Sequence, residues 1–146
     1  MTQRQKTSLE LTDFIHSEEF SLKLHEKTIK KILREQNFIL SNLNIILVDD
    51  EYLRSLHRQF LNEDSYTDVM TFPIEEGENR EAEIYISLER ANINAKNFSV
   101  SIEEEVTRLI IHGLLHLKGY DDKDNLSRTE MRKEEDRLLK KYWPKV

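Results

Sequence analysis

The spacing of hydrophobic and polar residues along the chain predicts a mixture of short strands and amphipathic helices. Runs rich in branched and aromatic residues predict strands at 8–11, 43–48, 67–74 and 82–87. Apolar residues at helical spacing predict helices at 22–33, 52–60, 88–98 and 126–142, and a further helix that starts after Ser101 and is ended by Gly119. Two polar segments indicate exposed loops at 62–65 and 75–81, and the second loop would join the two strands of a hairpin.

Signals for helix ends agree with these helices. Asp49 or Asp50 can cap the second helix, and Ser101 opens a capping box with Glu104 at the start of the fourth. The helices and strands do not alternate regularly, as they would in a doubly wound sheet. The sequence therefore predicts an α+β fold, with one small mixed β-sheet packed against about five helices, in a single domain over residues 1–146.

Composition narrows the possible classes of protein. With 146 residues, of which 38% are hydrophobic, the chain can bury one core and is short for two domains. Cysteine is absent, so a bound metal must use histidine, aspartate or glutamate, and a cytoplasmic location is favoured. Residues 1–6 lead into no apolar signal core, and no apolar run reaches the length of a membrane span. The net charge of −6 means that nucleic-acid binding would need a local basic patch.

The strongest chemical motif lies where the helix that starts after Ser101 ends. His112 and His116 are four residues apart, so on a helix both imidazoles project from one face and can share a cation. Gly119 suits the left-handed residue that ends a helix, and the turn after it can bring Asp122 back as a third ligand. Unpartnered imidazoles in this apolar stretch would cost about 1–3 kcal/mol each. The motif therefore predicts a metal site at the end of a central helix.

The predicted ligand set favours hydrolysis. Three protein ligands leave one position of a zinc ion open, and zinc lowers the pKa of bound water to about 7. The spacing is that of zinc-protease helices, but Gly113 replaces their catalytic glutamate, so a metalloprotease would need a base from elsewhere. Gly113 also weakens the helix interior, which indicates that a substrate or another backbone segment approaches closely. An iron oxygenase with two histidines and a carboxylate is disfavoured by the helical position of the ligands.

Three segments resemble a known family. Residues 112–120, HGLLHLKGY, are similar to the signature of the YbeY family of bacterial rRNA-maturation endoribonucleases. Residues 67–73, TDVMTFP, resemble the family's Thr-Asp-Val-Leu-Ser-Phe-Pro strand. Residues 83–87, EIYIS, resemble its next strand, with a glycine and an aspartate altered. The resemblance spans roughly residues 43–135, and the first forty residues carry none of the signature.

The resemblance implies a single-strand-selective endoribonuclease that uses one zinc ion to process ribosomal RNA precursors and takes part in ribosome quality control. Its partners would be single-stranded ribosomal RNA and components of the small ribosomal subunit. His112 and His116 match the first two metal ligands, and the family's third histidine falls on Asp122. Aspartate adds negative charge at the ion, so we expect hard metals to compete better and cleavage to have a more alkaline optimum than in a three-histidine relative.

A second departure from the family concerns phosphate binding. The family places an arginine seven residues before the aspartate of its Thr-Asp-Val strand, and this chain has Leu61 there. Arg58 and Arg54, three and seven residues earlier, could supply the phosphate contact, although a solvated arginine is an equally good interpretation of each. Asp68 could hold a ligand histidine by its second ring nitrogen, or it could cap the end of a strand.

The remaining histidines and two strand aromatics carry weaker signals. His16, His25 and His57 lack ligand spacing and are expected at the surface. Phe72 and Tyr85 could stack on nucleobases, although aromatic residues in strands more often belong to the core.

A second class of function remains open. In a non-catalytic ribosome-assembly factor, the metal would only clamp the end of the helix, and the protein would bind ribosomal components. The net negative charge and Leu61 favour this alternative.

Overall fold

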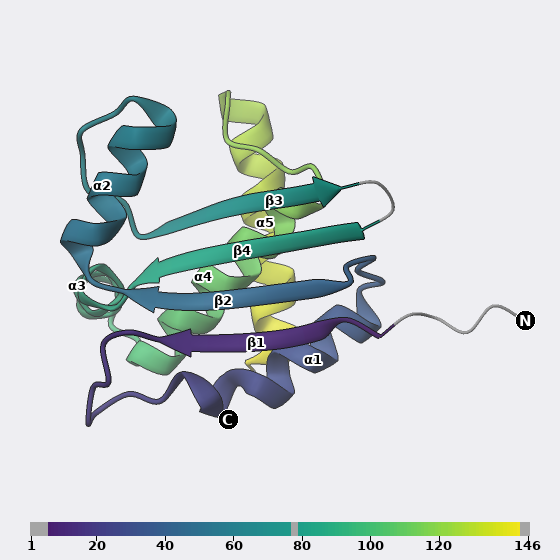
Figure 1. Ribbon diagram of the computed structural model, residues 1–146, viewed down its shortest axis with the longest axis horizontal. Helices are drawn as coiled ribbons and strands as arrows, with labels where there is room; N and C mark the ends of the chain where they lie inside the picture. Colours follow the sequence, from purple (N-terminus) through teal and green to yellow (C-terminus); the bar gives the residue numbers. More distant parts are fainter. Residues whose placement is uncertain (1–5, 77–78, 144–146) are drawn as a thin grey trace, which may run out of the picture.

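The computed structural model describes residues 6–76 and 79–143, which form one four-stranded sheet with helices around it (Figure 1). In chain order the elements are β1 (Ser8–Asp13), the 3-10 helix η1 (Leu22–His25), α1 (Glu26–Glu35), β2 (Asn42–Val48), α2 (Asp50–Leu61), β3 (Val69–Glu76), β4 (Asn79–Ser87), α3 (Leu88–Phe98), α4 (Ile102–Leu117) and α5 (Asn125–Tyr142). The predicted α+β fold with a mixed sheet is confirmed. No helix among the described residues is both long and apolar enough to cross a membrane.

The sheet has the strand order β1-β2-β4-β3. β1, β2 and β4 are parallel, whereas β3 pairs with β4 in the antiparallel direction and forms an edge. The backbone nitrogen of Ser87 donates to the carbonyl oxygen of Asp68 at 3.0 Å. Because hydrogen-bonded and non-hydrogen-bonded pairs alternate along an antiparallel ladder, Pro73 falls at a non-hydrogen-bonded position. Its nitrogen, which carries no hydrogen, therefore faces the free edge of β3.

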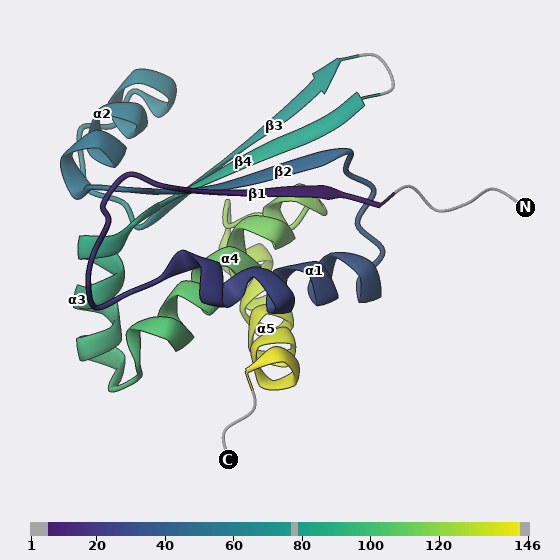
Figure 2. The same ribbon diagram turned by 60° about the horizontal axis from the view of Figure 1, so that its bottom comes forward.

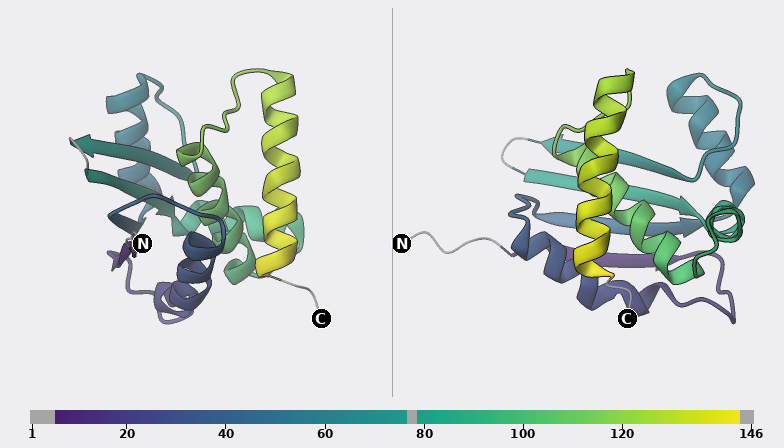
Figure 3. Two further views of the ribbon diagram at one scale, coloured as in Figure 1. Left: turned by 90° about the vertical axis from the view of Figure 1, so that its right-hand side faces the viewer. Right: turned by 180° about the vertical axis from the view of Figure 1, so that it is seen from behind.

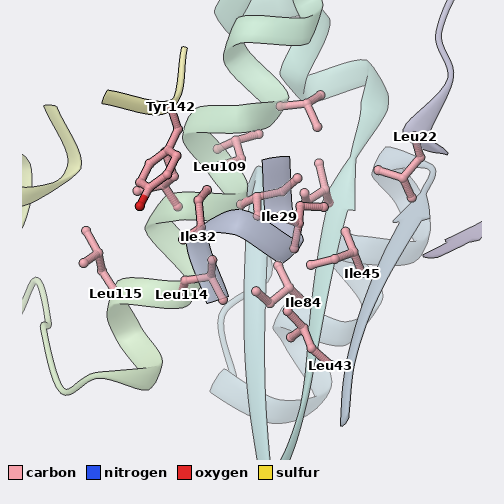
Figure 4. Close-up of a cluster of buried hydrophobic side chains, with 14 of the residues drawn as sticks. Leu22, Ile29, Ile32, Leu43, Ile45, Ile84, Leu109, Leu114, Leu115 and Tyr142 are labelled. Atoms are coloured by element: carbon pink, nitrogen blue, oxygen red, sulfur yellow. The ribbon is translucent and has the colours of Figure 1, made fainter. Parts of the chain in front are cut away.

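The two faces of the sheet are covered differently. Figure 2 shows α1, α4 and α5 on one face and α2 at one end of the other. Alternate residues of β2 and β4 point towards the larger helical layer, and Leu43, Ile45 and Ile84 are completely buried there. Figure 4 shows these strand side chains meeting residues of α1 and α4, among them Ile29 and Leu109. This layer is the main core.

Helix α4 lies inside that core. Its fully buried apolar side chains are Val106, Leu109, Ile110, Ile111, Leu114 and Leu115. Burying one such side chain contributes about 1.5–3 kcal/mol, so the position of α4 against the sheet is strongly determined. The Ser101 hydroxyl accepts a hydrogen bond from the Glu104 backbone at 3.1 Å, which confirms the expected N-cap.

Several expectations from the sequence need correction. The helix expected at 22–33 is divided into η1 and α1, and Leu24 is 74% exposed instead of buried. Most of the loop expected at 75–81 is strand, since β3 reaches Glu76 and β4 starts at Asn79; residues 77–78 lie outside the described residues. The expected surface position is wrong for His25 and His57, which are buried. Each of these two rings contacts a backbone carbonyl, of Glu103 and Ser65 respectively, at 3.0 Å.

Gly113 is required where α4 crosses the sheet. A Cβ atom at this position would lie 2.9 Å from Thr71 Oγ1 and 2.9 Å from Ile84 Cδ1. The close approach expected beside His112 therefore comes from side chains of β3 and β4, and not from a substrate or another backbone segment.

We expect Gly113→Ala to lower the free energy of unfolding by about 1 kcal/mol. Alanine would favour the helix by about 1 kcal/mol, but overpacking a core typically costs about 1–3 kcal/mol. Urea unfolding of the single variant and of Gly113→Ala in an Ile84→Val background measures the effect. Removing the Ile84 Cδ1 atom should reduce the cost of the added methyl group, and an equal cost in both backgrounds would contradict this account.

Candidate metal centre

The two histidines of the motif meet at the C-terminal end of α4. Their Nε2 atoms are 3.2 Å apart, and the two rings are nearly perpendicular, with centroids separated by 4.8 Å. The helix ends as the sequence predicts, because Gly119 has a φ of +100° and its nitrogen donates to the carbonyl oxygen of His116 at 3.0 Å. The closed helix end keeps both imidazoles on one side of α4, partly exposed to solvent.

A carboxylate determines the tautomer of His112. Its Nδ1 atom lies 2.7 Å from Glu135 Oε1, a carboxylate oxygen that can only accept a hydrogen bond when ionised. The hydrogen of His112 is therefore on Nδ1, and the Nε2 atom presents a free lone pair towards His116. This is the arrangement found in metal-binding histidines, whose second nitrogen donates to a carboxylate or carbonyl.

The second histidine is also held in a form that can bind a metal. Burial lowers the pKa of His116, and the nearby ring of His112 lowers it further, against the opposing effects of Asp122 and a backbone hydrogen bond to Tyr120. The neutral ring has a lone pair to donate. Two nitrogens bound to one tetrahedral zinc ion at 2.0–2.1 Å lie about 3.3 Å apart. The observed separation of 3.2 Å between the Nε2 atoms fits such an ion.

The third predicted ligand is not gathered with the other two. Asp122 is exposed in the segment between α4 and α5, and its charge raises the pKa of His116 without outweighing burial. Within residues 6–76 and 79–143, no group of three or more His, Asp, Glu or Cys side chains could hold a metal ion. Coordination by Asp122 therefore stays a prediction.

A buried ion-pair network supports the carboxylate behind His112. Arg108 donates to Glu135 at 3.1 Å and binds both oxygens of Glu105, at 2.8 and 2.6 Å. The side chains of Glu105 and Glu135 are only 1% and 8% exposed. Burial by itself would raise the pKa of Glu135, but the hydrogen bond from His112 and the charge of Arg108 lower it overall. Glu135 therefore remains an ionised acceptor.

Glu135 is not among the residues singled out from the sequence, because α5 is rich in charged residues and such residues usually lie on the solvated face of a helix. One signal was available. The buried residues of α5 are Met131, Glu135, Leu138 and Tyr142, spaced by four, three and four residues. A glutamate within the apolar stripe of an amphipathic helix indicates a buried partner of opposite charge or a hydrogen-bond donor.

The structure places Asp68 away from direct contact with the histidines. Its Oδ2 atom accepts a hydrogen bond from Asn94 at 3.0 Å, and Glu135 makes the histidine contact that the sequence suggested for Asp68.

The two candidate phosphate-binding arginines lie on α2, across the sheet from α4, as Figure 3 shows. Arg54 is occupied, because it binds Asp64 at 2.8 Å and the Tyr66 hydroxyl at 3.2 Å. Arg58 is exposed and makes no side-chain ion pair within the described part of the chain. Neither arginine contacts the histidines, so their role in phosphate binding stays a prediction, and Arg58 is the better placed of the two.

The two strand aromatics pack with their neighbours beneath α2. Phe72 lies edge-on to Phe60, with a centroid distance of 5.0 Å, and to Tyr85 at 5.6 Å. Both Phe72 and Tyr85 pack against the small cluster of buried residues formed by β2, β3 and α2. This packing favours the structural interpretation of these rings over base stacking.

Comparison with known proteins agrees with the resemblance seen in the sequence. The family model described as endoribonuclease YbeY matches residues 5–143. Endoribonuclease YbeY of Flavobacterium psychrophilum is 37% identical over 129 residues, which cover 85% of this chain and 92% of that protein. The corresponding protein of Flavobacterium johnsoniae is 41% identical over 97 residues, or 66% of this chain and 70% of that protein.

A solved structure shares the fold. The solution structure of TM1509 from Thermotoga maritima matches with a TM-score of 0.64 and 28% identity, covering 94% of this chain and 89% of that one. Taken with the family model and the curated relatives, this chain belongs to the YbeY family of endoribonucleases, which are hydrolases.

We expect Arg108→Met to lower the free energy of unfolding by about 3–5 kcal/mol at neutral pH, because it leaves two buried carboxylates without their cation. In the wild type the pKa of Glu135 is lowered, so its stabilising contribution is present above the ordinary value and is lost as the pH falls. Without Arg108 the pKa of Glu135 would be higher than in the wild type, so the variant would lose less stability than the wild type as the pH falls. The difference in the free energy of unfolding between the wild type and Arg108→Met should therefore become smaller as the pH falls.

Chemical unfolding at several pH values measures this difference. Arg132→Met on the exposed face of α5 is the control and should change the stability by less than about 0.5 kcal/mol. A difference between Arg108→Met and the wild type that widens as the pH falls would contradict the ion-pair account.

Proposed function

We propose that this protein is a metal-dependent, single-strand-specific endoribonuclease that acts in ribosomal RNA maturation and ribosome quality control. One zinc ion would be held by His112 and His116, with Asp122 completing the protein ligands. Membership of a family whose members are named endoribonucleases supports the activity. The observation that carries metal dependence is the 3.2 Å approach of the two Nε2 atoms.

The donor chemistry of the histidine pair supports this assignment. The tautomer set by Glu135 leaves a lone pair on His112 Nε2, and the lowered pKa of His116 favours its neutral ring. With the lone pair of His112 on Nε2, the 3.2 Å contact is short enough for a hydrogen bond donated by His116 Nε2–H in the metal-free protein, and a cation between the rings would replace that contact with two metal–nitrogen bonds. Aspartate is a competent zinc ligand, and Asp122 stands three residues after Gly119, the left-handed residue that closes α4.

The chemistry follows from where the ion would sit. Zinc supplies a Lewis acid for a phosphoryl oxygen and a source of nucleophilic water at neutral pH. The chain's own residues hold and orient the site: Glu135 keeps the hydrogen of His112 on Nδ1, and the closed end of α4 fixes both rings. Arg58, exposed on α2, would bind a phosphate of the RNA strand. Gly113 packs on Thr71 and Ile84 and provides no base, so the arrangement does not favour peptide hydrolysis.

The substrate and setting are proposed from the family. The substrate would be single-stranded ribosomal RNA, the partners would be components of the small ribosomal subunit, and the location would be the cytoplasm. The net charge of −6 means that RNA binding depends on local cations such as Arg58.

A non-catalytic ribosome-assembly factor is the second candidate. One observation favours it: within the described residues Asp122 is not gathered with the histidines, so the pair could serve only to clamp the end of α4. The two candidates differ in whether the purified protein cleaves RNA.

We expect His116→Ala to abolish chelator-sensitive cleavage of a single-stranded rRNA fragment and to lower the zinc content from about one equivalent per chain. His16→Ala, at an exposed histidine outside the site, is the matched control and should retain both properties. Cleavage assays, elemental analysis and circular dichroism test this together. A folded wild-type protein that holds zinc but cuts no RNA would support the assembly factor, and a stable metal-free wild type that cuts RNA would remove the ion from the proposal.

We expect Arg58→Ala to lower kcat/KM for RNA by about 10- to 100-fold, because losing a hydrogen bond to a charged group costs about 1.5–3 kcal/mol. Arg54→Ala should have a smaller effect on cleavage, since that guanidinium already binds Asp64. Steady-state kinetics on the same fragment compare the two variants. Undiminished rates in both would remove the arginines from the site.

A further inference from the structure

A network of partly buried polar contacts, called here the polar chain, runs from the histidine pair of α4 back to the first turn of that helix. It starts at Glu135, whose two carboxylate oxygens have different partners. Oε1 accepts from His112 Nδ1 at 2.7 Å, and Oε2 accepts from Arg108 Nη1 at 3.1 Å. Because both oxygens are engaged, the carboxylate can neither rotate nor move without breaking one of the two contacts.

The next member of the chain is held even more firmly. Arg108 donates from Nε and Nη2 to the two oxygens of Glu105 at 2.8 and 2.6 Å, which is a bidentate pair. Its guanidinium also lies over the ring of Phe98, 5.5 Å from the centroid. With this group fixed by Glu105 and Phe98, its remaining contact to Glu135 has a defined direction.

The polar chain continues from Glu105 to Asp68, the residue just before the edge strand β3. The amide nitrogen of Asn94 lies 3.1 Å from Glu105 Oε2 and 3.0 Å from Asp68 Oδ2. An amide nitrogen carries two hydrogens, so Asn94 can donate one to each carboxylate. Asp68 in turn accepts from the backbone of Ser87 through its carbonyl oxygen. Asp68 is thus connected to His112 through four intervening side chains.

The positive and negative charges of this polar chain do not balance. Two buried carboxylates, of Glu105 and Glu135, share one guanidinium, of Arg108, and the side chain of Glu105 is only 1% exposed. Asp68 is partly buried and also interacts electrostatically with Arg90. Burying ion pairs stabilises a fold weakly or not at all compared with apolar residues of the same size. An excess of buried negative charge is therefore poorly explained by stability alone, whereas it suits a device that orients a ligand of a cation.

We infer that Glu135 is the residue that positions His112, that Arg108 and Glu105 fix Glu135, and that Asp68 acts on the same site indirectly through Asn94. The inference rests on the proposed function in that His112 is taken as a metal ligand. The polar chain would select the Nδ1–H tautomer of His112. It would also keep the lone pair of His112 Nε2 directed at the position between the two histidines where the ion would bind.

The substitution Glu135→Gln tests this selection with almost no change in shape. Arg108 can only donate hydrogen bonds, so it should take the oxygen of the new amide and leave the amide NH₂ group facing His112. The Nδ1 atom of His112 must then accept, and the ring should change to the Nε2–H tautomer. Glu134→Gln, the same change at the adjacent position, leaves the network intact and is the matched control.

Nitrogen chemical shifts of the histidine rings in the metal-free protein report the tautomer directly, with no requirement for activity. We expect His112 to be Nδ1–H in the wild type and in Glu134→Gln, and Nε2–H in Glu135→Gln. An unchanged His112 tautomer in Glu135→Gln would overturn the inference. A role of Glu135 in folding alone would change thermal stability but would not reverse the tautomer.

Zinc affinity gives an independent readout, measured by competition with a chromophoric chelator. We expect Glu135→Gln to bind zinc about 10- to 100-fold more weakly than the wild type, and Glu134→Gln to bind as the wild type does. If the wild type bound no zinc, the proposed metal dependence would fail, but the tautomer measurement would still decide whether Glu135 positions His112. Equal zinc affinity in Glu135→Gln and the wild type would overturn the positioning role.

The substitution Asn94→Asp tests the part of the polar chain farthest from His112. It replaces the amide that can donate to both Asp68 and Glu105 by a carboxylate, which can donate to neither. We expect weaker zinc binding, but a smaller loss than in Glu135→Gln, because the change lies four contacts from His112. Asn92→Asp adds the same charge to the exposed face of α3 and is the control. Identical affinities in the two variants would remove Asn94 and Asp68 from the chain and leave Glu135 as a local partner of His112.

Discussion

The burial of α4 against the sheet is the constraint on which the rest of the structure depends. Most of the helix surface is apolar and inaccessible to water, and Gly113 lets its backbone come within contact of Thr71 and Ile84. A helix held in this way has only one side on which polar groups can meet solvent near its C-terminal end. His112 and His116 occupy that side, so their mutual approach follows from how α4 packs.

Much of this arrangement could be predicted from the sequence, because it depends on local periodicity and on turn chemistry. The spacing of His112 and His116 and the left-handed turn at Gly119 are properties of adjacent residues, and both appear in the structure as expected. Tertiary contacts explain the failures. His25 packs between Phe20 and Trp143, more than a hundred residues apart, and no local pattern predicts that contact.

The support of the histidine pair was the least predictable part of the site, although one of its residues left a trace in the sequence. Glu135 is 23 residues from His112, and the Arg108 pair that fixes it joins two helices whose relative placement depends on the core. The sequence suggested Asp68 as a partner of a histidine, and the structure places it at the opposite end of a polar chain. The sequence indicated that a carboxylate would be the partner of a ligand histidine. Which carboxylate it is depends on how the helices pack.

One feature of the sheet affects how the molecule behaves in a crowded solution. An edge strand normally offers a row of backbone groups on which a second copy of the chain can add a strand, and this is a common route to aggregation. At Pro73 that row lacks a donor, since the proline nitrogen faces outward from β3. The edge strand β3 can therefore stay accessible to solvent and still be a poor template for a second copy of the protein.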